Sequence, residues 1–200
     1  TSDSKSIDFT FNMLGKHNVL NAAAAAILCI YEGISIEIIQ DSLLKFEGID
    51  RRMQIFGERR VNNNHCIYID DYGHHPTEIE KTIEAIRESF SGYKINMVFQ
   101  PHRFTRTHDL FDKFIDVLGA VDQLLLLEIY SAGEKAIEGV DSSNIKKSLL
   151  NSGFNNVELF SNNDSIIKEL DQNIDSDTVF VFQGAGNISS ISNAIKKEVS

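Results

Sequence analysis

The chain has 200 residues, of which 42% are hydrophobic and 24% are charged, so it can build the packed core of a globular domain. Its formal net charge of −10 argues against a nucleic-acid-binding protein, which normally presents a basic surface. An anionic ligand is still compatible with this charge, because a local group of Arg and His side chains can bind phosphate within an acidic protein.

The two cysteines, Cys29 and Cys66, lie in apolar runs without a metal-type spacing, and a disulfide framework is not expected in a domain of this size. We therefore expect a reducing, cytoplasmic location. The first residues show no signal-peptide pattern. The longest apolar stretch, 22–31, is far shorter than the roughly 20 residues that span a membrane, so no membrane contact is expected. The chain begins without Met, and we expect it to be part of a longer protein.

Residues 7–13 alternate apolar and polar side chains, which predicts an edge or half-buried strand. A helix is predicted over 18–31, where five consecutive alanines favour helix formation. Ser35 is expected to cap a second helix that runs to about Phe46. Two helices cannot bury a core by themselves, so we expect residues 1–50 to pack on another part of the protein.

After Gly48 the pattern changes to short apolar runs that alternate with helical stretches. The predicted strands cover 66–70, 95–100, 123–129, 156–160 and 178–182. The predicted helices cover 77–90, 109–118, 142–150, 164–172 and 188–198. This alternation predicts βαβ units, and strands rich in Ile, Val, Leu and Phe are typical of parallel strands covered on both faces. We therefore predict an α/β fold with a mostly parallel sheet and helices on both faces.

Polar loops follow four of the predicted strands, at 70–76, 100–106, 128–134 and 183–187. The carboxyl ends of parallel strands meet at one edge of a sheet, and sheets of this type bind ligands there. This convergence predicts an active-site face formed by the four loops.

The first of these loops brings together Asp70, Asp71, Tyr72, His74 and His75. A carboxylate at a strand end can accept hydrogen bonds from a ribose, and a His can donate to an anion or transfer a proton. A structural alternative is that Asp71 or His75 caps the helix that begins near Pro76, although one cap does not account for four polar side chains. A metal site at His74 and His75 is a weaker alternative, because no third ligand is spaced nearby.

The second loop places Arg103 and Arg106 three residues apart, next to His102. Guanidinium groups bind carboxylate or phosphate bidentately, so the pair can hold an amino-acid carboxylate or stabilise charge on a transferring phosphoryl group. A solvated pair that balances the acidic chain is the alternative. Arg51 and Arg52 are either an ordinary linker or a phosphate contact that closes one domain on another.

Two further motifs are weak when taken alone. Gly184-Ala185-Gly186 resembles half of a dinucleotide fingerprint, but the third Gly is missing and the motif follows the last strand. Asn18 and Asn21 share one face of the first helix. Asn18 can serve as the N-cap, and the amide of Asn21 can pair with the edge of an adenine. No P-loop sequence occurs in the 200 residues.

Together these motifs resemble the Mur ligases, and they occur in that family's order over nearly the whole chain. The motifs are GKHNVLNA (15–22), RRMQ (51–54), DDYGHHPTE (70–78), FQPHRFTR (99–106), YSAGE (130–134) and GAG (184–186). The two longest are specific to the family, whereas HNxxN or Gly-Ala-Gly alone would not be. Met53 departs from the pattern, since the family more often has an aromatic residue there.

The resemblance implies a three-domain enzyme. Residues 1–50 would be the end of the central ATP-binding domain, and residues 51–200 would be the Rossmann-like C-terminal domain, which binds the amino acid. The missing N-terminal and central domains would carry the P-loop and most Mg²⁺ ligands. The implied reaction is ATP-dependent amide formation between UDP-N-acetylmuramate and L-alanine, through an acyl phosphate. A family member that attaches a recycled peptide to the same sugar, and a non-catalytic Rossmann-like binding module, are the alternatives.

The resemblance also assigns site residues. Asn18 and Asn21 match contacts to the adenine of ATP, Arg52 matches a contact to the phosphates, and Asp71 matches the ribose-binding carboxylate. The full set expected to bind ATP is His17, Asn18, Asn21, Arg52, Asp71 and Tyr72. The set expected to act on L-alanine and the acyl phosphate is His74, His102, Arg103 and Arg106.

Overall fold

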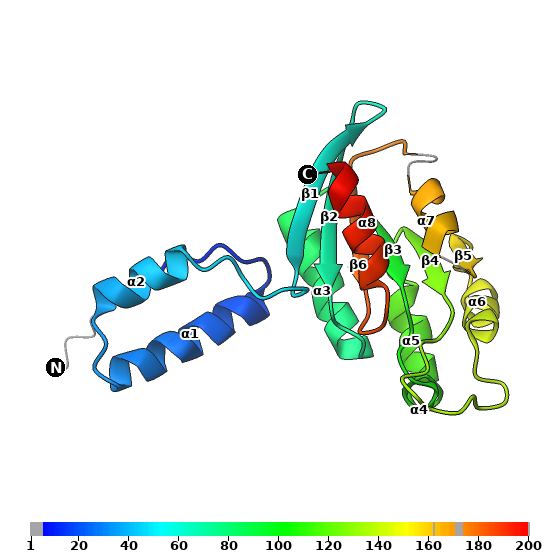
Figure 1. The fold of residues 1–200 in the computed structure, drawn as a ribbon, viewed down its shortest axis with the longest axis horizontal. Helices are drawn as coiled ribbons and strands as arrows, with labels where there is room; N and C mark the ends of the chain where they lie inside the picture. The colour runs from blue at the N-terminus through cyan, green and yellow to red at the C-terminus, as the bar shows by residue number, and fades with distance from the viewer. Residues whose placement is uncertain (1–5, 162, 171–173, 200) are drawn as a thin grey trace.

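In the computed structural model, which describes residues 6–161, 163–170 and 174–199, a pair of helices precedes a six-stranded α/β domain (Figure 1). The helices are α1 (Lys16–Tyr31), α2 (Ile36–Leu44), α3 (Pro76–Ser89), α4 (Phe104–Asp109), α5 (Phe111–Leu118), α6 (Ser142–Asn151), α7 (Asn163–Glu169) and α8 (Ser189–Val199). The strands are β1 (Gln54–Val61), β2 (Asn64–Asp71), β3 (Lys94–Phe99), β4 (Gln123–Leu127), β5 (Val157–Phe160) and β6 (Thr178–Gln183).

The sheet has the strand order β1-β2-β6-β3-β4-β5. Strands β2 to β6 are mutually parallel, and β1 pairs antiparallel with β2 at one edge. In this register Asp71 lies beside Gln183, and Gln183 lies beside Phe99. The carboxyl ends of β2, β6 and β3 therefore reach the same edge, as the sequence predicted.

Each face of the sheet packs on its own set of helices. Isoleucines of α3, Phe114 and Leu118 of α5, and Leu149 of α6 form one buried cluster with the sheet. Isoleucines of α7 and α8 form the other, against Tyr68, Phe180 and Phe182. A side chain such as Leu or Phe gains about 1.5–3 kcal/mol on full burial, so both faces contribute to stability. The prediction of a mostly parallel sheet covered on both faces is confirmed.

The antiparallel strand β1 was not predicted. Its sequence, QIFGERRV, contains charges and a glycine, and the pairing with β2 shifts register between Ile55 and Gly57. An Asn-rich turn joins β1 to β2. Asn62 and Asn63 both have positive φ, of 51° and 69°, as a two-residue hairpin turn of the favoured type requires.

The helix predicted over 109–118 is present as α5, and the short helix α4 directly before it was not predicted. Two other predictions of local structure were wrong. Residues 7–13 form no strand, because no strand in the described part of the chain lies beside them; Phe11 instead stacks on Phe46. Asn18 is not the N-cap of α1, since the helix begins after Gly15 and the Asn18 Nδ2 donates to the Leu14 carbonyl oxygen at 2.8 Å. The predicted end of α7 at Gln172 lies outside the described residues.

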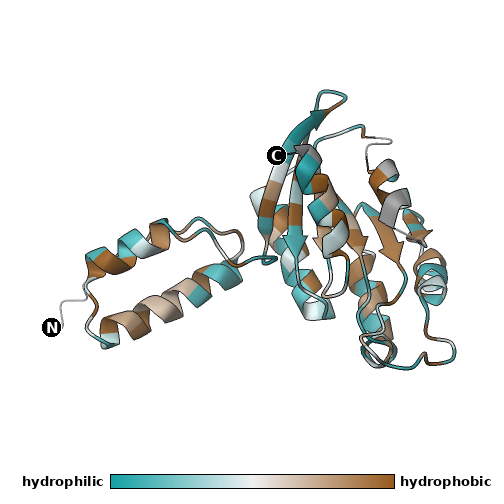
Figure 2. Cartoon of the chain, in the orientation of Figure 1, coloured by the Kyte–Doolittle hydropathy of each residue, from teal (hydrophilic) through white to brown (hydrophobic). Residues whose placement is uncertain are grey.

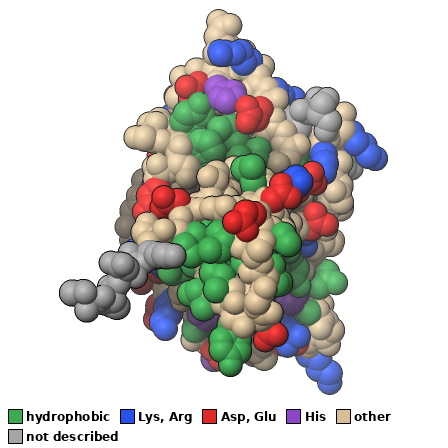
Figure 3. Space-filling model, turned by 90° about the vertical axis from the view of Figure 1, so that its left-hand side faces the viewer, with side chains coloured by type: hydrophobic (Ala, Val, Ile, Leu, Met, Phe, Trp, Pro, Cys, Tyr) green, Lys and Arg blue, Asp and Glu red, His purple; other side chains and the backbone are tan. Residues whose placement is uncertain are grey.

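The helical pair α1–α2 is rich in hydrophobic residues (Figure 2), and many of their side chains are exposed. Large exposed side chains include Leu20, Ile27 and Leu28 of α1 and Ile38 of α2. Figure 3, which looks at this end of the molecule, shows hydrophobic side chains gathered there. A contiguous apolar surface of this kind marks a contact with other protein. No helix among the described residues is long and apolar enough to cross a membrane.

Two adjacent leucines of α6 test the packing of the sheet. Leu149 is fully buried, whereas Leu150 is 41% exposed. We expect Leu149→Ala to lower the free energy of unfolding by about 2–5 kcal/mol, because it leaves a cavity in the core. Leu150→Ala is the matched control and should cost much less. Urea denaturation of the two variants measures the difference, and equal losses would contradict the packing described here.

Candidate active-site edge

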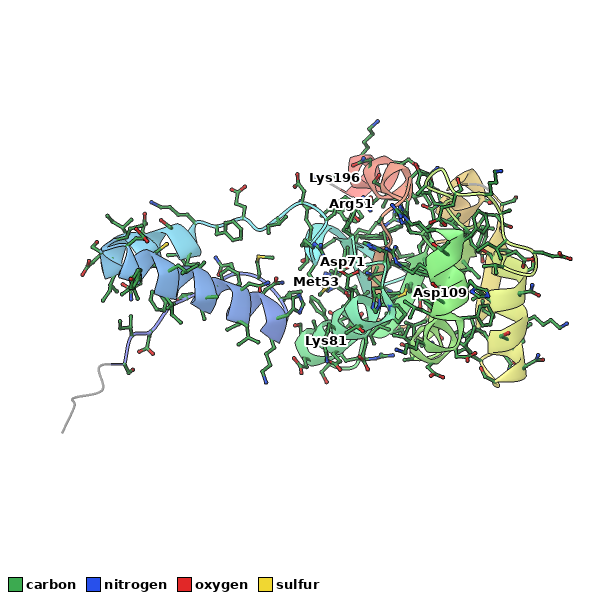
Figure 4. All side chains as sticks on the ribbon, turned by 90° about the horizontal axis from the view of Figure 1, so that it is seen from below. Arg51, Met53, Asp71, Lys81, Asp109 and Lys196 are labelled. Carbon is green, nitrogen blue, oxygen red and sulfur yellow. The ribbon has the colours of Figure 1, made fainter. Side chains whose placement is uncertain are left out.

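The four polar loops predicted from the sequence lie at the edge of the sheet where β2, β6, β3 and β4 end. Figure 4 looks onto this edge and shows Asp71 between the start of α1 and the body of the domain. The side chains there form two neighbouring groups. One group lines a cleft between α1 and α3, and the other forms a cluster around His102.

The Asp71 carboxylate connects several segments around the cleft by hydrogen bonds. Asp71 is 5% exposed, and its carboxylate accepts four hydrogen bonds. Oδ2 accepts from the Met53 amide at 2.9 Å. Oδ1 accepts from the Gly73 amide at 2.8 Å, from Gln183 Nε2 at 2.6 Å and from Thr82 Oγ1 at 3.3 Å. A carboxylate has about four lone-pair sites, two on each oxygen, so Oδ2 retains room for one more donor. The ribose contact expected of Asp71 is geometrically compatible with this arrangement.

The two arginines of the linker have different surroundings. Arg51 is half-buried; its Nε lies 3.2 Å from Asp70 Oδ1, and its Nη2 donates to the Gly184 carbonyl oxygen. Arg52 is exposed; its Nη1 lies 3.7 Å from Glu78 Oε1. Both guanidinium groups also lie over the ring of Tyr72, at 5.0 and 5.7 Å from its centroid. The Arg51 guanidinium is thus occupied by contacts within the domain, whereas the exposed Arg52 guanidinium can reach a ligand in the cleft.

The cleft has a volume of about 440 Å³ and lies between the start of α1 and α3. Its lining includes five of the six residues expected to bind ATP: His17, Asn18, Asn21, Arg52 and Asp71. The side-chain Nδ2 of Asn18 is already bonded to the Leu14 carbonyl oxygen, whereas Asn21 is exposed. Ligand pockets in proteins usually fall between about 300 and 1,000 Å³, so the cleft is large enough for the nucleoside part of a nucleotide.

The start of α3 is fixed by a capping box. His75 Nδ1 accepts from the Thr77 amide, and Glu78 Oε2 accepts from the His74 and His75 amides at 2.9 and 3.1 Å. Burial opposes ionisation of Glu78, but these amide bonds outweigh it and hold the pKa of its carboxyl below the usual range. The cap role weighed for His75 is confirmed. A metal site at His74 and His75 finds no support, since no three His, Cys, Asp or Glu side chains of the described residues are grouped to hold an ion.

The second group is a row of aromatic rings that runs across the edge. Tyr72 meets His74 edge to face, with centroids 5.5 Å apart. His74 lies 5.5 Å from His102, and His102 stacks on Tyr130 at the same distance. The loop that carries Asp71 and the loop that carries Arg103 therefore lie side by side, as expected. The structure places them in two adjoining groups and not in a single anion pocket, because the cleft lining does not include His102 or the arginines beside it.

His102 is set up as a neutral hydrogen-bonding group. Burial lowers its pKa, and the nearby charges of His74, Arg106 and Arg103 lower it further. Arg106 Nη1 lies 3.4 Å from His102 Nδ1 and 3.3 Å from the His102 carbonyl oxygen. Because a guanidinium can only donate, this contact makes Nδ1 the acceptor. A neutral ring that accepts at Nδ1 carries its proton on Nε2.

Arg103 has an unusual backbone conformation, with φ 75° and ψ 136°. Such a conformation costs a non-glycine residue on the order of 1–3 kcal/mol. Its amide donates to the Tyr130 carbonyl oxygen at 2.8 Å, and its own carbonyl accepts from Thr107 Oγ1 at 2.8 Å. The Arg103 guanidinium is half exposed, and its Nη1 lies 3.9 Å from Glu134 Oε1. The strain is therefore balanced by contacts that come from another loop.

The Gly-Ala-Gly segment serves close packing between loops. A Cβ on Gly184 would lie 2.8 Å from the Gln100 carbonyl oxygen, and one on Gly186 would lie 2.9 Å from the Tyr130 Cβ. Both distances are too short for a side chain. Gln100 also reaches across this junction, since Oε1 accepts from the Ile188 amide and Nε2 donates to Asn187. The glycines are thus explained without a nucleotide.

Sequence reasoning did not single out Gln183, Tyr130 or Glu134. Gln183 Nε2 binds Asp71 and also the Gly73 carbonyl oxygen. Tyr130 supports His102, and Glu134 contacts Thr105 and Arg103. All three lie in the polar loops that the sequence predicted to form the active-site face. Their partners are 28 to 112 residues away in sequence, and only the fold brings these pairs together.

The charge surroundings of His102 can be tested by NMR titration of the chain. We expect its imidazole to titrate below the ordinary value of about 6.5, because protonation adds charge to a partly buried site beside cations. Arg106→Gln removes one cation and should move the midpoint upward. Arg60→Gln, on the β1–β2 hairpin, should leave it unchanged. A wild-type midpoint at or above the ordinary value would contradict the arrangement described.

Comparisons with known proteins fit this geometry. Residues 51–186, more than half of the chain, match the family model described as "Mur ligase, glutamate ligase domain". A UDP-N-acetylmuramate–L-alanine ligase from Buchnera aphidicola is 42% identical over 96% of the chain. The chain spans 41% of that relative's length.

Solved structures show the same fold. The crystal structure of UDP-N-acetylmuramate–alanine ligase from Thermotoga maritima aligns with a TM-score of 0.77 and 27% identity, over 99% of this chain and 41% of that one. A murein peptide ligase from Psychrobacter arcticus aligns with a TM-score of 0.63 and 22% identity, over 94% of this chain and 38% of that one; at this identity the likeness concerns the fold alone. On the extent of the family match, this chain belongs to the Mur ligase family.

Proposed function

We propose that the full protein is an ATP-dependent ligase that joins L-alanine to UDP-N-acetylmuramate in the synthesis of the peptidoglycan precursor. The observation that carries the proposal is the meeting of two loops at one edge, where the His74–His102 contact joins the loop that carries Asp71 to the loop that carries Arg103. The Buchnera aphidicola relative, 42% identical and named as the L-alanine ligase, supports this choice within the family.

In the proposed reaction the muramyl carboxylate is phosphorylated from ATP to an acyl phosphate. The amine of L-alanine attacks the acyl carbon, and the tetrahedral intermediate expels phosphate. Negative charge accumulates on the phosphoryl oxygens, and the alanine carboxylate also has to be neutralised. Fixed cationic and N–H donors stabilise such charge most effectively when they are in place before the reaction.

The cleft is the proposed nucleotide contact of this domain. Asn21 would pair with the adenine, beside His17 and Asn18. Arg52 would reach the phosphates, since it is exposed and held over Tyr72. The unused lone pair on Asp71 Oδ2 would accept from a ribose hydroxyl. The lining of this cleft by residues of both α1 and α3 supports a nucleotide held between the two parts of the chain.

The cluster around His102 is the proposed amino-acid site. The half-exposed Arg103 guanidinium offers two parallel donors to a carboxylate. Arg106 is tied to His102, and the Nε2–H of His102 adds a neutral donor beside them. His74, between Tyr72 and His102, stands where the nucleotide and the amino acid would meet.

Residues 1–50 are proposed to be the end of the central ATP-binding domain, and residues 51–200 the amino-acid-binding domain. The exposed apolar side of α1 and α2 supports this division, because the remainder of a central domain would cover it. The Mg²⁺ of the reaction does not find a ligand set among the described residues, so its ligands are expected upstream, with the P-loop.

The first test uses the intact protein. We expect phosphate release from ATP only when UDP-N-acetylmuramate and L-alanine are both present, with the amide product identified by mass spectrometry. The 200-residue chain alone should form no amide, because it carries no P-loop. Product from a preformed peptide but not from L-alanine would point to the peptide-attaching family member. Nucleotide binding without ligation by the intact protein would point to a binding module.

Arg103 provides a second test of the amino-acid site. In the intact protein, Arg103→Ala should raise KM for L-alanine by about tenfold or more, since a hydrogen bond to a charged group contributes about 1.5–3 kcal/mol. Binding of UDP-N-acetylmuramate, measured by calorimetry, should not change. Arg60→Ala removes a charge far from the edge and serves as the control. Equal losses in the use of both substrates would remove the role proposed for Arg103.

A further inference from the structure

Glu134 reaches from the β4–α6 loop to the start of α4. Its Oε2 accepts from the Thr105 amide at 3.0 Å, and its Oε1 accepts from Thr105 Oγ1 at 2.8 Å. The same carboxylate lies 3.9 Å from Arg103 Nη1. The Glu134 side chain thus forms two hydrogen bonds with Thr105 in the first turn of α4. It also lies near the guanidinium of Arg103, the residue that precedes this helix.

A tight turn brings Glu134 to this place. Ala132 and Gly133 both have positive φ, of 50° and 85°, and the Glu134 amide donates to the Ser131 carbonyl oxygen at 3.0 Å. Ala132 is a non-glycine residue in a conformation that favours glycine. The segment before the turn is also anchored, because the Tyr130 amide donates to Pro101 and the Tyr130 carbonyl accepts from Arg103.

The Glu134 carboxylate is ionised in this setting. The amide of Thr105, followed by its hydroxyl and by Arg103, lowers the pKa of Glu134 against the opposing effect of burial. An ionised carboxylate accepts two hydrogen bonds on separate oxygens and attracts a guanidinium, whereas an amide has only one acceptor oxygen. The interaction with Thr105 and Arg103 therefore depends on the charge of Glu134 and not only on its size.

We propose that Glu134 is a positioning residue that holds the strained Arg103 backbone and directs the Arg103 guanidinium toward the incoming amino-acid carboxylate. Glu134 itself does not touch the substrate. It fixes the β3–α4 loop from the β4–α6 loop, so that the Arg103 side chain is in place before the amino acid binds. This inference rests on the proposed ligase function. Its tests distinguish a failure of the inference from a failure of the proposed function.

The test compares Glu134→Gln, Glu134→Asp and Glu138→Gln in the intact enzyme. Glu138 lies exposed on the same loop, so Glu138→Gln is the matched control for loss of one negative charge. We expect Glu134→Gln to raise KM for L-alanine by about tenfold, the order expected for loss of a charged hydrogen bond, with KM for ATP and the melting temperature unchanged. Glu134→Asp, which keeps the charge, should recover part of the effect.

A double-mutant cycle with Thr105→Val tests whether Glu134 affects the use of L-alanine through its contact with Thr105. If Glu134 acts through Thr105, the double variant should be no worse than Glu134→Gln alone, because the two side chains share one interaction. Glu134→Gln behaving like Glu138→Gln, or KM for ATP rising together with KM for L-alanine, would overturn the proposal.

Amide hydrogen exchange of the intact protein gives a readout that does not require the reaction. Glu134→Gln should accelerate exchange over residues 104–107 and leave α3 unchanged. If the wild-type protein does not use L-alanine, the proposed function fails, while local loss of protection still supports the hold of Glu134 on the Arg103 loop. Unchanged exchange over 104–107 would overturn the inference whatever the substrate.

Discussion

The buried carboxylate of Asp71 is the interaction on which the rest of the edge depends. It binds an amide of the linker, an amide of its own loop, a hydroxyl of α3 and the amide of Gln183 at the end of β6. The linker, the loop after β2, α3 and the end of β6 thus share one acceptor. An unpaired buried charge is costly, and a fully hydrogen-bonded one is specific in its geometry. This geometry fixes where Arg52, Tyr72 and His74 can lie.

Cationic groups gather at this edge although the chain as a whole is acidic. Stacking on Tyr72 and Tyr130, and pairing with Glu78 and Glu134, keep the arginine and histidine side chains close together despite their mutual repulsion. The low pKa of His102 is part of the same balance, since a neutral ring avoids one more positive charge. The edge can therefore accept an anionic ligand without first rearranging its own charges, which is the value of a preorganised site.

The sequence predicted the parallel strands and their helices well, because continuous Val, Ile, Leu and Phe runs can only be buried on both faces. The prediction from sequence failed where pairing with another segment decides the local structure. Residues 7–13 have the alternation of a strand, but no strand within the described ranges lies beside them. β1 has a neighbour, but its sequence is interrupted by Gly57 and by charges. The same holds for the site. His74, His102 and Arg103 were singled out as candidates from their positions after strands, whereas the role proposed for Glu134 depends on a contact with Thr105 across 29 residues.

The linker between α2 and β1 connects the helical pair to the α/β domain, and its hydrogen bonds limit where the chain can bend. Arg51 and Met53 have φ of 58° and 49°, and the segment is pinned by Asp71 through Met53 and by the Tyr72 amide, which donates to the Arg51 carbonyl oxygen at 2.6 Å. Residues 51–53 are therefore hydrogen-bonded to the end of β2. Any rotation of the α/β domain about the helical pair would have its pivot between the end of α2 and Asp50. Arg52 lies on the domain side of that pivot, so such a rotation would change its distance from the start of α1.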